Sequence, residues 1–359
     1  MTSSLLTTSK LIFCISPHDI RFFRYSPSPR GTTYVALKIL VSKESESTTE
    51  LRILHHIMKA APTEGPRYIT RLLDEFEHQG PNGVHKCLVF EPMGPNVNSM
   101  VLELPQFNSR KWTMKIRYPP QMAKSILKQS LQSIAFLYEN GISHGDFQPG
   151  NILFVLDNVE AAPEDLLLRE EDMLTTWCSA PVQRLDDKQD KWAPQYLYVA
   201  QPLVSPTCYS RESKVKLSDM GGAYFFTDPP KKLITPIALR PPELVLTGTW
   251  DKTLDVWSFG CLLFELMTGE SFFCIPYDKK QDQDDMYFLS ITEQLGPLPD
   301  ELFNHWKNSS LYFTPERKLF NCPLGGGPPE RNCLCWSKAL WKSSLIRQLR
   351  ISVTKKLPR

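Results

Sequence analysis

An amphipathic segment in the middle of this 359-residue chain runs directly into a short polar motif and then into an apolar run. Between residues 120 and 139, apolar side chains recur at intervals of three and four, which predicts a helix with one buried face. The polar residues His144, Asp146 and Asn151 follow, and the apolar run at 152–154 predicts a buried strand. Because loops on a rigid scaffold often carry function, the carboxylate and the amide of this loop are candidates for chemistry.

A lysine and two further carboxylates complete a set that suits phosphoryl transfer. Lys38 interrupts the apolar run at 34–41, which predicts a buried strand, and Glu50 opens a helical pattern twelve positions later. Asp219 stands in the motif D-M-G behind the strand-like run at 215–217. Phosphoryl transfer needs a lysine on the phosphates, a carboxylate that orients the lysine, an aspartate near the attacking hydroxyl, and an Asn/Asp pair for Mg²⁺. Each motif alone is consistent with an ordinary strand end, helix start or turn, so the argument rests on their combination.

The order of the motifs resembles that of eukaryotic protein kinases. V-A-L-K at 35–38, H-G-D at 144–146 with Asn151, and D-M-G at 219–221 are similar to the kinase motifs V-A-I-K, H-R-D-x-x-x-x-N and D-F-G. R-P-P-E at 240–243 stands where kinases have A-P-E, and D-V-W-S-F-G at 255–260 looks like kinase helix F, whose aspartate holds the catalytic-loop backbone. The resemblance implies an α+β, bilobal protein-kinase-like fold with a small β-rich N-lobe and a larger helical C-lobe.

Two features narrow the resemblance to the SR-protein kinases. L-V-F-E-P-M-G at 88–94 is similar to the hinge of that family, and Asp219 follows Asn151 by 68 positions, where most kinases have a short hairpin and SR-protein kinases have a spacer. The phrase H-G-D-F-Q-P-G-N at 144–151 is similar to the loop of fungal SR-protein-kinase-like proteins. The resemblance covers about 34–320.

The predicted domain organisation follows from these motifs. Residues 1–30 are expected to be a divergent or disordered segment, and 31–94 the kinase N-lobe. The C-lobe is expected at 95–320, with a largely irregular spacer at about 156–213, and 321–359 is expected to be a divergent tail.

The resemblance also implies roles for individual residues. Phe90 would be the gatekeeper beside the adenine. The implied catalytic residues are Asp146, Lys38 and Gln148. The implied ATP-binding residues are Lys38, Glu50, Glu91 and Met93, the last two through their backbone. Asn151 and Asp219 would bind Mg²⁺.

Three departures from the kinase pattern affect the expected activity. Gly31 is the only glycine upstream of Lys38, so the phosphate-covering loop G-x-G-x-x-G is missing, which should weaken the binding and positioning of ATP. Gly145 replaces the arginine that docks a phosphorylated activation loop, which suggests that phosphorylation does not switch this segment. Gln148 replaces a lysine that contacts the transferred phosphate, so this position contributes no positive charge.

We therefore expect a serine/threonine protein kinase of the SR-protein type. Its cofactors would be ATP and Mg²⁺, and its substrates would be proteins, with Arg/Ser-rich splicing-type proteins as the finer expectation. A pseudokinase that binds partners without useful turnover is the alternative, favoured by the missing glycine loop and by Gln148. A small-molecule kinase of similar fold is a third interpretation, against which the motifs at 240–243 and 255–260 speak.

Composition limits the remaining classes. Lys plus Arg is 41 against 39 for Asp plus Glu, a net charge of +2 that gives no support for direct nucleic-acid binding. No apolar run approaches the ~18 residues of a membrane span, so we expect no membrane partner. Nine scattered cysteines without a C-x-x-C pair favour a reduced chain, and we expect a monomer in the cytoplasm and nucleus. The Ser/Thr-rich N-terminus, whose first acid is Asp19, leaves a mitochondrial transit peptide as the alternative.

Overall fold

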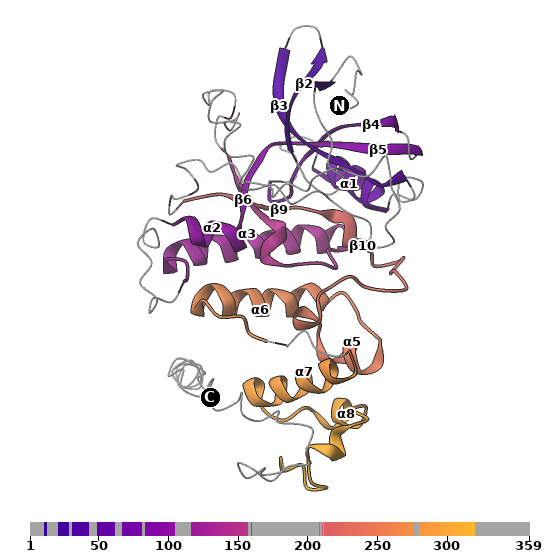
Figure 1. The fold of residues 1–359 in the computed structure, drawn as a ribbon, viewed down its shortest axis with the longest axis vertical. Coiled ribbons are helices and arrows are strands. Elements are labelled where there is room, and N and C mark those ends of the chain that lie inside the picture. The colour runs from indigo at the N-terminus through magenta and orange to yellow at the C-terminus, as the bar shows by residue number, and fades with distance from the viewer. Residues whose placement is uncertain are drawn as a thin grey trace, which may run out of the picture. The chain divides into compact units, whose positions relative to one another are not determined.

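The structure is a computed structural model (Figure 1). It describes residues 11–12, 21–28, 31–42, 49–61, 67–80, 83–104, 116–156, 159, 208, 210, 212–273, 275 and 280–319. Nearly all of the predicted spacer and the whole predicted tail at 321–359 lie outside the described residues. The chain divides into two compact units, the first comprising Met1–Pro241 with Trp250–Phe272 and the second Pro242–Thr249 with Phe273–Arg359.

The first unit contains an antiparallel five-stranded sheet in the order β1-β2-β3-β5-β4. Its strands are β1 (Leu11–Ile12), β2 (Arg21–Ser28), β3 (Gly31–Ile39), β4 (Leu72–Gly80) and β5 (Gly83–Phe90). The expected small sheet with one helix, α1 (Thr49–Ala60), is confirmed. β1 and β2 belong to the range 1–30, so the sheet begins upstream of the predicted lobe boundary at residue 31.

Strand alternation decides where Lys38 lies. Successive side chains of a strand point to opposite faces of the sheet. Val35 and Leu37 of β3 form a small buried cluster with Cys87 and Val89 of β5. Ala36 packs instead into the main core, which also contains the buried residues of α1. Lys38, two positions after Ala36, therefore points to the face of the sheet that α1 covers.

The rest of the first unit is mainly helical. Its elements are β6 (Met93–Asn96), α2 (Val97–Glu103), α3 (Pro120–Glu139), β7 (Ile142–Ser143), η3 (Pro149–Asn151), β8 (Ile152–Val155), β9 (Val215–Leu217), η7 (Met220–Gly222), β10 (Tyr224–Phe225), η8 (Ile237–Leu239) and α6 (Leu254–Thr268). α3 begins and ends where the sequence pattern predicts. β6, β8 and β9 form a three-stranded sheet, and β7 pairs with β10. None of the described helices is long and apolar enough to cross a membrane.

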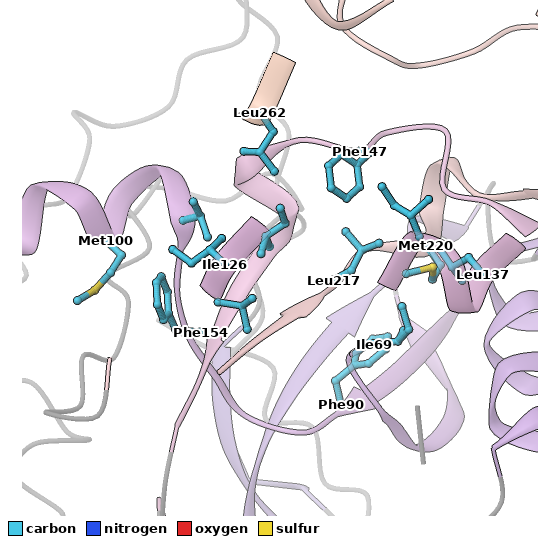
Figure 2. Packing of buried hydrophobic residues seen from close by; sticks show 14 of the residues in the cluster. Ile69, Phe90, Met100, Ile126, Leu137, Phe147, Phe154, Leu217, Met220 and Leu262 are labelled. Carbon is cyan, nitrogen blue, oxygen red and sulfur yellow. The ribbon is translucent and has the colours of Figure 1, made fainter. Parts of the chain in front are cut away.

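One continuous core joins the five-stranded sheet to these helices. Phe90 at the end of β5 and Leu217 of β9 belong to the same buried cluster as Ile126 of α3 and Leu262 of α6 (Figure 2). Phe147, from the loop between β7 and η3, is fully buried in this cluster. The loops that carry the predicted site residues are therefore held by packing on both sides.

The second unit has its own aromatic core. It contains α5 (Pro242–Thr247), α7 (Lys280–Leu295), α8 (Asp300–Phe303) and η9 (Ser309–Leu311). The rings of Phe288 and Trp306 pack with centroids 5.2 Å apart. The buried carboxylate of Asp285 accepts hydrogen bonds from Trp306 Nε1 at 2.7 Å and from Asn308 Nδ2 at 2.9 Å. These bonds satisfy a carboxylate that would otherwise be costly to bury.

Two glycines after α3 adopt nearly the same left-handed backbone conformation in different surroundings. φ is +70° at Gly141 and +71° at Gly145. A Cβ added at Gly141 would meet no atom within 4 Å, whereas one at Gly145 would overlap the carbonyl oxygen of Gly222. Gly145 therefore allows the loop after β7 to lie directly against η7.

This pair of glycines predicts unequal costs for the same substitution. Gly141→Ala should lower the free energy of unfolding by roughly 1–2 kcal/mol, the cost of a left-handed L-residue. Gly145→Ala should cost about 1–3 kcal/mol more, because the added methyl must also displace the backbone of Gly222. Urea denaturation of the two variants and the wild type measures the difference. Equal losses would show that the close approach at Gly145 does not exist in solution.

Candidate active site

A three-residue charged cluster lies between the sheet, α1 and the turn after β9. Lys38 Nζ is 2.7 Å from Glu50 Oε1 and 2.8 Å from Asp219 Oδ1. Glu50 is supplied by the first turn of α1, and its side chain is 9% exposed, against 24% for Lys38 and 47% for Asp219. The structure thus brings together three predicted site residues from distant parts of the chain, with Asp219 as the member most open to solvent.

The charges of the cluster stabilise one another. Burial alone would lower the pKa of Lys38, but the attraction of Glu50 and Asp219 outweighs it and raises that pKa above its usual value. Burial alone would raise the pKa of Asp219, but the charge and the hydrogen bond of Lys38 lower it below its usual value. Both groups are therefore charged at neutral pH, as a site for an anionic phosphate and a metal cation requires.

The backbone at Asp219 is held in an unusual conformation. Asp219 has φ +59° and ψ +79°, a left-handed conformation that is uncommon for a residue with a side chain, and its Oδ1 accepts a hydrogen bond from Gly221 N at 3.3 Å. A Cβ on Gly221 would lie 3.1 Å from Asp219 Oδ1 and 3.7 Å from Lys38 Nζ. The glycine therefore leaves room for the ion pair. Strain of this kind is concentrated at functional sites.

Asp146 is positioned by neutral groups. Its Oδ2 accepts hydrogen bonds from Gln148 Nε2 at 2.9 Å and from Asn151 Nδ2 at 3.0 Å. Asn151 Nδ2 also donates to the carbonyl oxygen of Asp146 at 2.9 Å. Burial raises the pKa of Asp146 above its usual value, and the bonds from Gln148 and Asn151 offset this only in part. Three predicted site residues thus meet here, with the two amides on the same carboxylate oxygen.

Asp255 of α6 holds the loop that carries Asp146. Its Oδ2 accepts from Ser143 Oγ at 2.9 Å and from His144 N at 2.7 Å, and its Oδ1 accepts from Gly145 N at 3.0 Å. These bonds match the role implied for the aspartate of kinase helix F. His144 Nε2 lies 3.0 Å from the carbonyl oxygen of Ser218, the residue before Asp219. The Asp146 loop and the Asp219 turn are therefore linked through a buried histidine.

The segment after Asp219 returns to the Asp146 loop. The buried Thr235 donates from Oγ1 to the carbonyl oxygen of Gly145, and Arg240 Nε donates to the carbonyl oxygen of Thr235 at 2.7 Å. The sequence reading missed Thr235, because nothing in the local pattern marks a threonine whose partner is 90 positions away. Thr235 thus anchors the short segment between D-M-G and R-P-P-E to the Asp146 loop, and Arg240 holds the backbone of Thr235.

The predicted hinge residues lie on the connection between β5 and β6. Phe90 is buried at the end of β5, and Met93 begins β6 and is also buried. The Glu91 carboxylate accepts from Lys216 Nζ at 2.6 Å and from Arg71 N at 2.8 Å. Lys216, a single lysine in the short strand β9, is a second residue that the sequence reading missed. Its ion pair fixes the side chain of Glu91, whose backbone N–H donates to the carbonyl oxygen of Arg71 at 3.2 Å.

The residues that would hold Mg²⁺ offer suitable oxygen atoms. Mg²⁺ binds through one or two protein oxygens together with waters and substrate phosphates. Asn151 makes both of its hydrogen bonds to Asp146 through its amide nitrogen, and an amide oxygen is a ligand that such a cation accepts. Asp219 adds a carboxylate with a lowered pKa. The described residues contain no cluster of three or more His, Cys, Asp and Glu. Asn151 and Asp219 therefore fit a metal bound chiefly through phosphates.

Comparison with known proteins finds similarity to protein kinases. The family model of the protein kinase domain matches residues 207–334. The serine/threonine-protein kinase SRPK of Physarum polycephalum is 30% identical over 304 residues, which cover 80% of this chain and 67% of that protein. Protein kinase dsk1 of Schizosaccharomyces pombe is 26% identical, with 80% of this chain and 65% of that protein covered. Mouse dual specificity protein kinase CLK2 is 25% identical, with 79% and 46% covered.

The chain thus spans between about half and two thirds of the length of these relatives. A crystal structure of a kinase domain that is 22% identical gives a TM-score of 0.59 and covers 96% of this chain and 86% of that one, a likeness in fold. Together with the motif order and the geometry above, these matches show that the chain belongs to the SRPK-like family of serine/threonine protein kinases and has the bilobal protein-kinase fold.

Proposed function

We propose that this chain transfers the γ-phosphate of ATP to serine and threonine hydroxyls of proteins. The observation that carries the proposal is the contact of Lys38 Nζ with both Glu50 and Asp219, at 2.7 and 2.8 Å. A second observation concerns Asp146. The hydrogen-bond partners of its carboxylate described above are neutral amides. Such a carboxylate is available to orient a substrate hydroxyl.

Each residue then has a separate task. Lys38 would bind the phosphates, and Glu50 holds its ammonium group in place. Asn151 and Asp219 would hold Mg²⁺, which when bound neutralises the charge on the phosphate oxygens. Asp146 would accept a hydrogen bond from the acceptor hydroxyl, and the amides of Gln148 and Asn151 fix its orientation. Positioning of this kind contributes most of the catalysis in phosphoryl transfer.

The substrate class is the finer part of the proposal. The relatives include SRPK of Physarum polycephalum and dsk1 of Schizosaccharomyces pombe, and the resemblance to SR-protein kinases implies Arg/Ser-rich proteins as substrates. We therefore propose Arg/Ser-rich protein segments as substrates. We also propose that the chain acts as a monomer in the cytoplasm and nucleus, without direct nucleic-acid or membrane partners, in line with its net charge of +2.

Asp146→Asn tests the proposed chemistry. The substitution keeps the size of the side chain but removes the carboxylate that orients the hydroxyl, so kcat should fall roughly 10²–10⁴-fold. Binding of Mg-ATP should change far less, because Asn151 keeps its hydrogen bond to the backbone carbonyl oxygen of residue 146. The measurement is radiolabelled phosphate transfer to an Arg/Ser-repeat peptide, with nucleotide binding followed separately. The matched control is Asp300→Asn, which makes the same substitution at an exposed carboxylate of the second unit.

The outcomes of this experiment separate the alternatives. Transfer that survives Asp146→Asn undiminished would show that Asp146 is not the catalytic carboxylate. Absence of both transfer and Mg-ATP binding in the wild type would favour the pseudokinase.

Gln148→Lys tests whether the missing cation limits the rate. Gln148 Nε2 is 2.9 Å from Asp146 Oδ2, the carboxylate that would orient the acceptor hydroxyl. In the proposed function, an ammonium group at this position would therefore lie near the phosphate that this hydroxyl attacks. Electrostatic stabilisation of a transition state by one group is worth a few kcal/mol, so kcat should rise by about tenfold or more. Gln148→Met, which has similar length and no charge or N–H group, should instead lower kcat. Similar rates for the two variants would show that residue 148 does not act on the transferred phosphate.

A further inference from the structure

A phenylalanine of β10 packs against two side chains of α1. The ring of Phe225 meets the ring of His56 edge to face, with centroids 5.4 Å apart and planes at 87°. The guanidinium group of Arg52 lies over the same ring, 5.7 Å from its centroid. Arg52 and His56 are four positions apart on α1, so their side chains are neighbours on one face of the helix. Phe225 therefore contacts α1 across one full turn.

The backbone of Phe225 is held from the other side by the strand that leads into the Asp146 loop. β10 pairs antiparallel with β7, and Phe226, directly after β10, donates from its N–H to the carbonyl oxygen of Gly141 at 2.8 Å. β7 runs straight into the Asp146 loop, whose backbone is held by Asp255. β10 thus connects α1 to the same anchored backbone that positions Asp146.

The position of α1 decides whether Glu50 can reach Lys38. Glu50 lies in the first turn of α1, and its Oε1 is 2.7 Å from Lys38 Nζ. A functional site of this kind has to be held within about 0.5 Å of its working geometry. Burial of the apolar face of α1 is favourable but non-directional, so it does not by itself fix the helix so closely. Directional contacts from a second side are needed.

The ionic contacts of α1 with neighbouring elements are weaker restraints than the ring of Phe225. Arg52 Nη1 is 3.9 Å from Asp228 Oδ2, and both side chains of this pair are more than half exposed. Ion pairs this exposed contribute little, because water screens them. Phe225 is partly buried against the main core and makes a cation–π contact and an aromatic contact at once. The ring is therefore the stronger restraint on this side of α1.

We propose that Phe225 is a positioning residue, which holds α1 where Glu50 orients the ammonium group of Lys38. The proposal rests on the proposed kinase function. The contacts of Phe225 described above are with α1, so its effect on the reaction would pass through Glu50. Because β10 is bound to β7, the same contact makes the placement of Glu50 depend on the backbone that carries Asp146.

The first test removes the ring and measures kcat/KM for Mg-ATP with an Arg/Ser-repeat peptide as acceptor. Phe225→Ala should lower kcat/KM by about threefold to tenfold, the factor that one or two aromatic contacts correspond to. Phe225→Leu keeps most of the apolar bulk without the ring, and it should lower kcat/KM in the same direction. Phe225→Tyr keeps the ring and should restore the wild-type value.

Phe226→Ala is the matched control. The ring of Phe226 packs against Tyr138 of α3, with centroids 5.4 Å apart, so the same substitution removes a ring that faces another helix. It should leave kcat/KM within about twofold of the wild type, even if it lowers the melting temperature. An equal loss of kcat/KM in Phe225→Ala and Phe226→Ala would overturn the proposal, because it would show general destabilisation.

A double-mutant cycle tests whether Phe225 acts through Glu50. In the Glu50→Gln background the ion pair with Lys38 is already lost, so Phe225→Ala should then change kcat/KM by less than about twofold. A loss as large as in the wild-type background would overturn the proposal, and so would a wild-type kcat/KM in the single variant Phe225→Ala.

Amide hydrogen exchange tests the placement of α1 without any catalysis. Exchange within α1 should be at least about threefold faster in Phe225→Ala than in Phe226→Ala, because the helix loses a restraint only in the first variant. Exchange of α1 that is unchanged in Phe225→Ala would overturn the proposal. A wild-type chain that transfers no phosphate would instead contradict the proposed function, and the exchange measurement would still decide whether Phe225 holds α1.

Discussion

The ammonium group of Lys38 between two carboxylates is the interaction on which the site depends. Burial disfavours the charge on Lys38 and on Asp219. The attraction of Glu50 and Asp219 nevertheless raises the pKa of Lys38, and Lys38 lowers the pKa of Asp219. The three groups come from β3, from α1 and from the turn after β9, so the pair of contacts exists only when all three elements are in place. The continuous core beneath them, from Phe90 to Leu262, is what makes that placement possible (Figure 2).

The Asp146 half of the site is built on a different principle. Its carboxylate is oriented by two amides, and its backbone by Asp255, whose two oxygens accept three hydrogen bonds. Neutral donors fix the orientation of this carboxylate. The ring of the buried His144 lies at hydrogen-bond distance from the carbonyl oxygen of Ser218, which links this half of the site to the half that contains Asp219.

Sequence reasoning predicted the parts of the site that local patterns mark. Lys38 at a strand end, Glu50 at a helix start and Asp146 with Asn151 in one loop each carry a signal within about ten residues. Thr235 and Lys216 carry none, because their partners, Gly145 and Glu91, are 90 and 125 positions away. β1 and β2 escaped prediction for another reason: β1 has only two residues, and the neighbouring sequence lacks the alternation by which strands are recognised. Only the pairing of β1 with β2, and of β2 with β3, reveals them as part of the sheet.

The pairing of these strands changes what the lack of glycine in residues 1–30 implies for the sheet. Backbone hydrogen bonds between strands do not require glycine, and β1, β2 and β3 pair in order although residues 1–30 contain none. The departure therefore concerns the glycine content upstream of Lys38, and the pairing of the described strands does not depend on it. Backbone N–H groups approach phosphates most closely where glycine leaves them uncovered. In the proposed function, Lys38 and the oxygens of Asn151 and Asp219 would therefore contribute a larger share of the nucleotide binding. Because Lys38 is already bound to two carboxylates, it can bind phosphate at the site without first being ordered.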